Sequence, residues 1–421
     1  MSLKHKVKNY NLADKGHKQI EWAESRMPVL NKIRERFTKE KPFKGITISA
    51  TLHVTKETAV LVKTLMDGGA IVGLSGSNPL STSDAVAAAL VDDGIHVYAW
   101  REQSIEEYYE CIRSILSLNP KILHDDGADM IGYVHENQTE LIPDIVAALE
   151  ETTTGVIRLR AMEKDGALKF PVFAVNDANS KRMFDNKYGT GQSTIDGIMR
   201  ATSLLLAGKN FVVCGYGWVG RGIASRAKGM GSNVIVTEVD PLKALEAFMD
   251  GFRVMTIQEA AAIGDIFVTA TGCVDVIRGE HFKNMKDGVV LANSGHFDVE
   301  ISKPDLVELS NGQEEVRPGV TQYSLNNGRR IYLLGEGRLV NLSCAEGHPP
   351  EVMDMSFANQ ALTAEWLNKK NTVKKLEKKV YSVPVEIDQE IARHKLKSMN
   401  IDIDQLTKTQ RVYMENWKEG T

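Results

Sequence analysis

A glycine-rich segment near the middle of the chain has the residue types and spacing of a phosphate-binding loop. Gly215, Gly217 and Gly220 form the pattern G-x-G-x-x-G, which follows the apolar run 210–214 and opens a segment of helical character. The first glycine permits a tight turn, the second lets the backbone approach a pyrophosphate, and the third lets the helix pack closely on the strand. A helix N-terminus at this point offers free N–H groups and a positive dipole end to the phosphates. The segment therefore predicts a dinucleotide-binding site.

An acidic residue at the end of the following strand helps to define the dinucleotide. Glu238 lies about twenty residues beyond the first glycine, where a carboxylate accepts hydrogen bonds from the ribose 2′-OH and repels a 2′-phosphate. This position favours NAD over NADP, although the cation of Lys243 nearby shifts the balance slightly toward NADP. The alternative interpretation is a glycine turn that only packs a helix against a sheet.

Alternating apolar and amphipathic segments surround this loop and must position it. Strands are expected where short runs are apolar and β-branched, at 45–50, 70–74, 95–100, 121–124, 210–214, 233–237, 265–270 and 288–292. Helices are expected between them and toward the end of the chain, at 57–66, 84–91, 104–118, 193–207, 224–230 and 350–368. This alternation, with tight Gly and Pro punctuation, predicts parallel sheets covered by helices on both faces.

Length and composition exclude several classes of protein. The chain has 421 residues, of which 43% are hydrophobic and 25% charged, so it is long enough for two or three globular domains. Its 51 basic and 55 acidic residues give a net charge of −4, which offers no basic field for nucleic acid. No apolar run approaches the ~20 residues that span a bilayer. Since the basic residues 1–10 lead into a polar segment and the four cysteines are far apart, we expect a cytoplasmic protein.

Many short segments outside the glycine loop resemble S-adenosyl-L-homocysteine hydrolases, and they occur in that family's order from about residue 40 onward. In the first half these segments are L-H-V-T-K-E-T-A (52–59), S-N-P-L-S-T (77–82), D-D-G (125–127), E-E-T-T-T-G-V (150–156), V-N-D (175–177), Lys181, F-D-N (184–186) and Y-G (188–189). In the second half they are T-G-C (271–273), G-H-F-D-V-E (295–300), E-G-R-L-V-N-L (336–342) and G-H-P (347–349). These motifs together point to one family, whereas the glycine loop alone is shared by many dehydrogenases.

The resemblance implies an α/β fold with two Rossmann-like, doubly wound parallel-sheet domains. A discontinuous substrate domain would comprise residues 1–182 and 345–385, with an NAD-binding domain inserted at 183–344. Residues 386–421 would form a C-terminal oligomerisation arm. The two crossings between the domains would act as a hinge that closes the cleft.

The reaction implied by the resemblance is the reversible hydrolysis of S-adenosyl-L-homocysteine to adenosine and L-homocysteine. A tightly held NAD⁺ oxidises the ribose 3′-OH, which acidifies the C4′ proton so that homocysteine is eliminated and water can add. Lys181, with its pKa lowered by burial beside Asp185, would take the 3′-OH proton. Asp126 would take the C4′ proton, and His53 would protonate the leaving sulfur and activate water. Outside this frame, Lys181 and Asp185 could be an exposed helical ion pair of little value.

The other site residues are also carried over from the resemblance. The expected substrate-binding residues are Thr55, Glu57, Asp126, Glu151, Lys181, Asp185, His296 and His348. The expected cofactor-binding residues are Thr152, Thr153, Thr154, Asn186, Gly215, Gly217, Trp218, Val219, Gly220, Arg221, Gly222, Glu238, Lys243, Thr271, Ser294, Gly295, His296, Asn341 and His348. No metal is expected.

Several departures from the family pattern affect these expectations. Trp218 stands where many members have Asp, Lys243 where many have Asn, and Thr190 where many have Cys. The ending 412–421 (VYMENWKEGT) lacks the Lys and Tyr motif with which many members reach a neighbour's NAD, as in the shorter archaeal and thermophilic bacterial branch. The apolar residues of the arm are too few for a core of their own, so the arm must pack on another surface. Because family tails dock on a neighbouring subunit near its cofactor, the resemblance implies a homotetramer built from dimers that exchange this arm.

Three alternative functions are left open by the sequence. The substrate could be S-inosyl-L-homocysteine, which some archaeal relatives use, because one exocyclic group separates the two bases. The chain could also be an ordinary NAD-dependent dehydrogenase that releases NADH. A regulatory NAD-binding relative without catalysis is the third, although the four expected catalytic residues are all retained.

Overall fold

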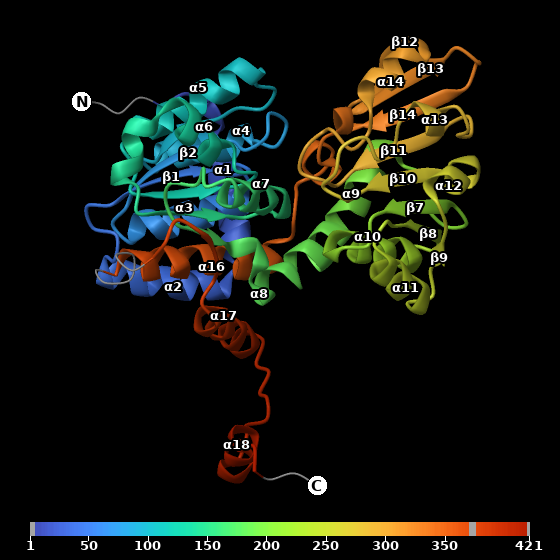
Figure 1. The fold of residues 1–421 in the computed structure, drawn as a ribbon. Coiled ribbons are helices and arrows are strands. Elements are labelled where there is room, and N and C mark those ends of the chain that lie inside the picture. The colour runs from blue at the N-terminus through green and yellow to red at the C-terminus, as the bar shows by residue number, and fades with distance from the viewer. Residues whose placement is uncertain (1–4, 370–375, 419–421) are drawn as a thin grey trace.

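Two lobes of similar architecture make up the computed structural model of the protein, which describes residues 5–369 and 376–418. The first lobe contains segments from both ends of the chain, and the second lobe is inserted between them (Figure 1). The discontinuous α/β architecture expected from the sequence is therefore confirmed. Within the described residues, no helix is long and apolar enough to cross a membrane.

A seven-stranded sheet forms the centre of the first lobe. Its strands are β1 (Thr47–Thr51), β2 (Ile71–Ser75), β3 (His96–Tyr98), β4 (Ile122–Asp125), β5 (Ala147–Glu150), β6 (Val172–Ala174) and β15 (Val380–Ser382). They lie in the order β15-β6-β5-β4-β1-β2-β3, and neighbours pair in parallel. The residues of β4 and β5 are buried throughout because helices cover both faces of the sheet.

Helices pack on the two faces of this sheet and form two separate hydrophobic cores. One core joins the sheet to α1 (Ala13–Glu24), α2 (Pro28–Glu40), α3 (Lys56–Asp67), α4 (Asp84–Asp92), α16 (Pro350–Asn368) and α17 (Val385–Ser398). The other joins it to α5 (Ile105–Leu116), α6 (Asp129–Asn137) and α7 (Thr153–Lys164). Since α16 fills the first core with Phe357 and Leu362, that core is completed only by the segment that follows the inserted lobe.

An eight-stranded sheet forms the second lobe. Its strands are β7 (Asn210–Cys214), β8 (Asn233–Thr237), β9 (Arg253–Val254), β10 (Ile266–Thr269), β11 (Val289–Asn293), β12 (Ser310–Arg317), β13 (Val320–Leu325) and β14 (Arg330–Leu334). The order is β12-β13-β14-β11-β10-β7-β8-β9. The surrounding helices are α9 (Thr190–Thr202), α10 (Trp218–Gly229), α11 (Pro241–Met249), α12 (Ile257–Ile263), α13 (Gly279–Phe282), α14 (Lys303–Glu308) and α15 (Val340–Ser343).

One edge of the second sheet differs from the fully parallel arrangement expected from the sequence. Neighbours in the run β14-β11-β10-β7-β8-β9 pair in parallel, but β12 pairs with β13, and β13 with β14, in antiparallel fashion. Short turns at Pro318-Gly319 and 326–329 join these three strands. A parallel pair needs a crossover of a dozen or more residues, so these short connections permit only hairpins.

Both sheets reverse their winding beside the first strand of the lobe. In the first lobe β1 lies between β2 and β4, and in the second lobe β7 lies between β8 and β10. At such a point the loops at the carboxyl ends of the strands diverge and leave a crevice for a ligand. His53 and Asp126 follow β1 and β4, while Gly215 and Thr271 follow β7 and β10. The topology therefore gives each lobe a ligand-binding edge that carries expected site residues.

The first crossing between the lobes is an almost continuous helical path. The short helix α8 (Asn179–Arg182) leads into a π-helical turn at Asp185–Gly189, which continues into α9. Gly222 of α10 lies so close to this turn that a Cβ atom there would overlap the carbonyl oxygen of Lys187. The glycine therefore lets α10 pack directly on the crossing.

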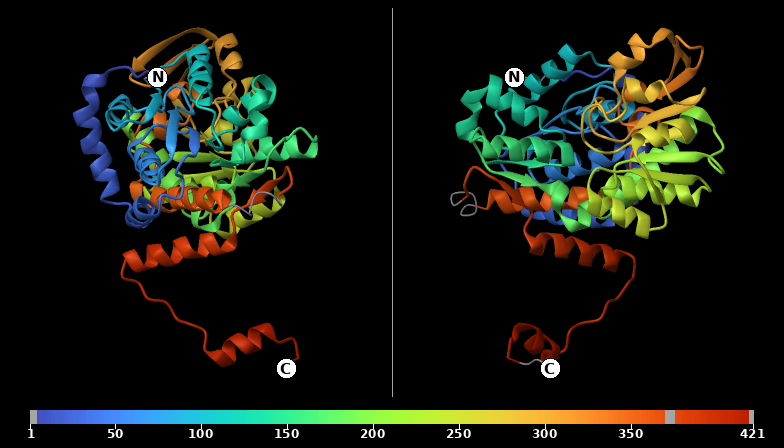
Figure 2. Two further views of the ribbon diagram at one scale, coloured as in Figure 1. Left: turned by 90° about the vertical axis from the view of Figure 1, so that its left-hand side faces the viewer. Right: turned by 45° about the vertical axis from the view of Figure 1, so that its right-hand side comes forward.

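The last helices leave the body of the protein in two stages. Helix α17 packs on the first lobe through Ile387 and Ile391, which are 8% and 0% exposed. Its Asp388 also accepts hydrogen bonds of 2.8 Å from the backbone N–H groups at the start of α8. Beyond Met399 an extended segment leads to α18 (Lys408–Glu415), which projects away from both lobes (Figures 1 and 2). The projecting segment thus begins after α17, within the range 386–421 where the sequence predicts a C-terminal oligomerisation arm, and the role of that arm stays a prediction.

Replacing Gly222 by Ala should destabilise the packing of α10 on the crossing. The added Cβ has no space, so we expect the free energy of unfolding to fall by about 1–3 kcal/mol. Gly229→Ala at the end of the same helix is the matched control, because a Cβ there meets nothing within 4 Å. It should be neutral or stabilising by up to about 1 kcal/mol. Equal denaturant midpoints for the two variants would show that the close contact is not required.

Candidate active site

A cavity of about 990 Å³ lies between the two lobes, where the carboxyl ends of both sheets meet. The catalytic, substrate-binding and cofactor-binding residues expected from the sequence all line it, with the exception of Gly220 and Gly222. These two glycines are buried behind the loop, and a Cβ on Gly220 would overlap the carbonyl oxygen of Gly215. The fold thus gathers residues that are spread from position 53 to position 348 around one cavity.

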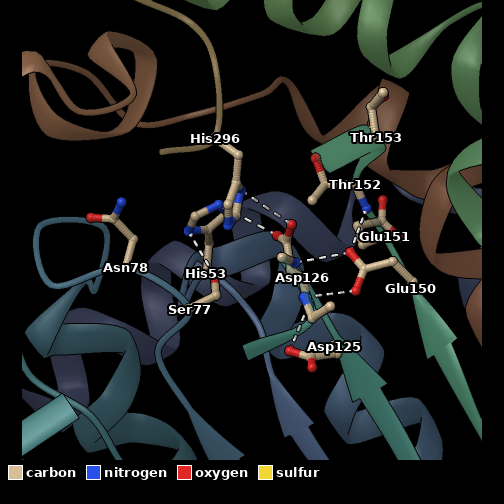
Figure 3. Close-up of polar contacts among 12 residues, drawn as sticks. His53, Ser77, Asn78, Asp125, Asp126, Glu150, Glu151, Thr152, Thr153 and His296 are labelled. Atoms are coloured by element: carbon tan, nitrogen blue, oxygen red, sulfur yellow. Dashed lines mark hydrogen bonds and ion pairs between the residues drawn. The ribbon is translucent and has the colours of Figure 1, made fainter. Parts of the chain in front are cut away.

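His53, Asp126 and His296 form the first polar cluster in this cavity (Figure 3). Oδ2 of Asp126 lies 3.4 Å from Nε2 of His53, and its Oδ1 lies 3.6 Å from Nδ1 of His296. His296 comes from the second lobe, so the cluster is complete only when the lobes are together. One ligand atom from each residue lies within 4.8 Å of the others, a spacing compatible with a metal ion. The expectation that the protein binds no metal therefore stays a prediction.

Two serines of the S-N-P-L-S-T segment hold the other nitrogen of the His53 ring. Nδ1 lies 2.7 Å from Oγ of Ser81 and 3.0 Å from Oγ of Ser77. Ser81 donates its own proton to the carbonyl of Asn78, so it accepts the Nδ1–H of the ring. Burial lowers the pKa of His53 to about 4, although Asp126 opposes the shift. The ring is therefore neutral near pH 7 and must receive a proton before it can act as the expected acid.

A sharp turn after β4 directs Asp126 into the cavity. The carboxylate of Glu150 on β5 accepts hydrogen bonds of 2.9 and 3.0 Å from the next two backbone N–H groups and fixes the turn. Gly127 has a φ of +111°, and a Cβ there would overlap the ring of His296. Asp125 instead accepts a backbone hydrogen bond of 2.8 Å from the first turn of α6. The adjacent aspartates thus divide their roles, one supporting the turn and one facing the cavity.

Lys181 is the centre of a second, fully buried cluster. Its Nζ lies 3.3 Å from Oδ1 of Asp185 and 3.5 Å from Oε1 of Glu151. It also donates a hydrogen bond of 2.8 Å to Oδ1 of Asn186. Burial alone would lower the pKa of Lys181, but the two carboxylates outweigh it and raise that pKa above its ordinary value. The sequence-based expectation of a lowered lysine pKa is therefore wrong.

The two carboxylates beside Lys181 have opposite pKa shifts. Oδ2 of Asp185 accepts a hydrogen bond of 2.7 Å from Ser356, and its Oδ1 lies 3.3 Å from Nδ1 of His348. Burial would raise the pKa of Asp185, but Lys181 and His348 outweigh it and hold that pKa well below its usual range. Burial raises the pKa of Glu151 to about 8, with Lys181 opposing the shift. Glu151 is therefore the member of this cluster that can take up a proton near neutral pH.

The second-lobe side of the cavity has the features that a dinucleotide requires. Gly215 has a φ of +101°, and Gly217 has open space where a Cβ would stand, so a phosphate can approach the backbone. Glu238 lines the same side, with its carboxylate oriented by backbone N–H groups at 2.7 Å. Oδ1 of Asn341, another lining residue, is buried without a hydrogen-bond partner in the described part of the chain. These residues fit an NAD molecule.

Two family models match the chain. The model described as S-adenosyl-L-homocysteine hydrolase matches residues 4–149, and the model described as S-adenosyl-L-homocysteine hydrolase, NAD binding domain, matches residues 186–347. The chain belongs to the S-adenosyl-L-homocysteine hydrolase family. This hydrolase is accordingly an enzyme with NAD as its cofactor.

Relatives of this hydrolase match over their whole length and carry two different names. An adenosylhomocysteinase of Saccharolobus solfataricus is 61% identical over 420 residues, which cover 100% of both chains. An S-inosyl-L-homocysteine hydrolase of Methanocaldococcus jannaschii is 60% identical over 417 residues, covering 99% of this chain and 100% of the relative. An adenosylhomocysteinase of Aquifex aeolicus is 60% identical over 416 residues, covering 99% of each. Identity alone therefore does not separate the two substrates.

Two polar residues of α16 support the Lys181 cluster of this hydrolase, and neither was among the site residues expected from the sequence. Ser356 donates to Asp185, and Gln360 donates to Glu151 with 2.5 Å between Nε2 and Oε2. They lie four positions apart, on one face of the helix. Buried polar residues at that spacing in an apolar helix are a signal that the sequence does contain.

Replacing Glu238 by Gln should weaken NAD binding by about tenfold, because an amide is a poorer acceptor for the ribose hydroxyls. Discrimination against NADP should also decrease, since the repulsion of a 2′-phosphate is removed. Nζ of the nearby Lys243 lies 3.7 Å from Oδ2 of Asp240, and this carboxylate limits the attraction of the lysine for that phosphate. Dissociation constants of both dinucleotides measure the effect, with Glu308→Gln on the exposed side of α14 as control. An unchanged preference in the Glu238 variant would contradict this assignment.

Proposed function

We propose that this hydrolase catalyses the reversible hydrolysis of S-adenosyl-L-homocysteine to adenosine and L-homocysteine. The observation that carries the proposal is that two buried proton-handling clusters and a dinucleotide loop line one cavity. A nucleoside in this cavity can present its ribose to both clusters and to the cofactor. When bound, NAD⁺ supplies the hydride acceptor that makes the ribose 3′ carbon reactive.

Lys181 is the proposed acceptor of the 3′-OH proton. Its ammonium is held by Asp185 and Glu151 in the free protein, so it must lose a proton before it can accept one. Glu151 lies 3.5 Å away and has a pKa raised to about 8 by burial, which suits it to receive that proton. The cluster therefore supports a path from the substrate through Lys181 to Glu151, while Asp185 stays ionised.

Asp126 is the proposed acceptor of the C4′ proton, and His53 is the next group along the path. Nε2 of His53 lies 3.4 Å from Asp126 and carries a lone pair. The proton can pass from the carboxyl group to the ring and then to the departing thiolate. The same ring can later accept a proton from the water that adds to the nucleoside.

The surroundings of Glu57 favour adenine over hypoxanthine as the base. Glu57 is 1% exposed and lines the cavity, and its Oε1 has no hydrogen-bond partner among the described residues. Burial raises the pKa of Glu57 overall, although the Lys56 ammonium lies 3.3 Å from Oε1 and favours the carboxylate. A carboxylate only accepts hydrogen bonds, so it matches the amino group of adenine and repels the carbonyl of hypoxanthine. The inosyl substrate is the second candidate, favoured by similarity to the Methanocaldococcus enzyme.

Two other functions account for less of the site. A dehydrogenase that releases NADH needs only one acid–base cluster, for which the Lys181 cluster would be enough. The Asp126 cluster would then have no role. A regulatory relative without catalysis would not need a lysine buried among carboxylates, which is a costly arrangement to keep.

Incubation of the purified NAD-loaded protein with each nucleoside thioether tests the proposal through the homocysteine released. We expect the adenosyl compound to react at least about tenfold faster than the inosyl compound, as one hydrogen bond to a charged group can provide. Glu57→Gln should narrow this ratio because an amide can present either a donor or an acceptor. Glu35→Gln on the exposed side of α2 should preserve it. No homocysteine from either compound, or net production of NADH, would reject the proposal.

Two substitutions should separate ribose oxidation from elimination. Lys181→Met should abolish the reduction of bound NAD⁺ that follows addition of adenosine, because the 3′-OH proton loses its acceptor. Asp126→Asn should retain that reduction but slow homocysteine release at least about a hundredfold, since the C4′ proton cannot be removed. NADH absorbance and thiol release measure the two steps. NADH formation in the lysine variant, or normal turnover in the asparagine variant, would contradict these roles.

We further propose a homotetramer in which the projecting segment covers the second lobe of a neighbour. This segment exposes Ile401, Ile403, Leu406, Val412, Tyr413, Met414 and Trp417. Helix α11, close to Glu238, exposes Leu242, Leu245, Phe248 and Met249. Contact between the two apolar sets in different subunits would remove both from water and strengthen the cofactor site by mass action.

Deleting residues 400–421 should give smaller species in light scattering and a weaker retention of NAD through gel filtration. The deletion spares α17, so the thermal unfolding of the first lobe should change little. A truncated protein that stays tetrameric and keeps its NAD would show that this segment is not an interface.

The cellular setting is also part of the proposal. We place the activity in the methyl cycle of one-carbon metabolism and in the cytoplasm. The partners are then the nucleoside thioether, adenosine, homocysteine and further copies of the same chain. The near-neutral charge balance supports neither nucleic acid nor an anionic membrane surface as a partner.

A further inference from the structure

A buried hydrogen-bonded chain runs from His124 through Gln360 to Glu151, behind the cavity. Nδ1 of His124 lies 2.6 Å from Oε1 of Gln360, and Nε2 of Gln360 lies 2.5 Å from Oε2 of Glu151. The three side chains come from β4, α16 and the end of β5, and they are 0%, 1% and 6% exposed. His124 and Gln360 are not among the cavity-lining residues, so they act on the site only through Glu151.

The donors and acceptors of this hydrogen-bonded series can be arranged in two ways, and the protonation state of Glu151 selects between them. An ionised Glu151 only accepts, so the amide of Gln360 turns its NH₂ group toward it and its oxygen toward His124, whose Nδ1 then carries the proton. A protonated Glu151 can donate to the amide oxygen instead. The amide must then turn over, and His124 must carry its proton on Nε2.

The surroundings of His124 favour the first direction. Its Nε2 is buried and has no hydrogen-bond partner among the residues that the structure describes. A bare lone pair in that position costs less than a buried N–H group without an acceptor. Burial also lowers the pKa of His124 to about 4, so the ring does not gain a second proton near pH 7. His124 therefore keeps the NH₂ group of Gln360 directed at Glu151.

We propose that Gln360, oriented by His124, is a positioning residue that favours the ionised form of Glu151 and keeps Oε1 turned toward Lys181. Because Gln360 occupies Oε2, the other oxygen is left for the lysine, 3.5 Å from Nζ and without a hydrogen-bond partner among the described residues. Glu151 is then ready to receive the lysine proton as a 3′-OH approaches. This inference rests on the proposed function, since the orientation matters only where Lys181 deprotonates a substrate.

Charged groups on three other elements face Glu151 and also shift its pKa. Lys181 on α8 favours the ionised form, whereas Asp185 in the π-helical turn and Asp126 after β4 disfavour it. These three residues line the cavity, so changing any of them alters the site itself. Gln360 and His124 can be changed from behind, without altering the cavity wall.

Gln360→Met removes the donor at nearly unchanged volume. A carboxylate that loses a hydrogen bond titrates at higher pH, so the acid limb of ribose oxidation should move up by about one pH unit. The rate of NAD⁺ reduction after adding adenosine should fall about tenfold on the acid side and recover on the alkaline side. His124→Leu allows the Gln360 amide to turn over. It should also move the acid limb of ribose oxidation to higher pH, but by less than Gln360→Met does.

The double variant and a control distinguish positioning from general damage. His124 acts through Gln360, so the double variant should be no worse than Gln360→Met alone. His135→Leu removes another histidine of the same lobe, which packs on Phe170 away from the cavity, and should leave the limb in place. Rates that fall equally at every pH, or effects of the two substitutions that add, would overturn the positioning role.

Direct titration of Glu151 separates this inference from the proposed function. The infrared band of its carboxylic acid is identified by its loss in Glu151→Gln. In the NAD-loaded Gln360→Met protein, the midpoint of this band should move to higher pH, whether or not the protein oxidises adenosine. A midpoint that does not move overturns the positioning role. Wild-type protein that fails to reduce NAD⁺ with adenosine overturns the proposed function instead.

Discussion

The ammonium group of Lys181 is buried where the two lobes meet, and the need to balance its charge organises the structure around it. An unpaired ammonium in such a place would be strongly unfavourable and would lose its proton. Carboxylates therefore approach from the π-helical turn and from the end of β5. Their remaining oxygens are satisfied by Ser356 and Gln360 from a helix that follows the inserted lobe. A single charge thus ties together segments that are far apart in the sequence.

The parts of the fold that could be predicted have local signals. The strands at 210–214 and 233–237 and the helix at 350–368 coincide with β7, β8 and α16, because apolar runs there are bounded by Gly, Asn or Pro. The glycine loop is equally local, since three glycines at fixed spacing determine its turn. The residues around the cavity could be found because the family resemblance lies in short contiguous motifs at the ends of strands.

The parts that could not be predicted depend on contacts between distant segments. The pKa of Lys181 is raised because Asp185 and Glu151 together outweigh burial, and Glu151 follows a strand distant in the sequence, whereas spacing alone indicated only Asp185. Helix α17 is held on the first lobe because Ile391 meets a core built by α2 and α16, which an amphipathic pattern does not reveal. Gln360 was missed for the same reason, because its partners lie on β4 and after β5.

The π-helical turn at Asp185–Gly189 is at once the path between the lobes and the carrier of Asp185 and Asn186. If the lobes separate about this path, His296 of the second lobe is withdrawn from Asp126, whereas Asp185 stays bound to Ser356 of the first lobe. A protein built in this way has a complete Asp126 cluster only while its cleft is closed. Exit of a nucleoside and completion of this cluster are then mutually exclusive. The rigidity of both crossings between the lobes therefore bears on how rarely a turnover ends with loss of the ketone.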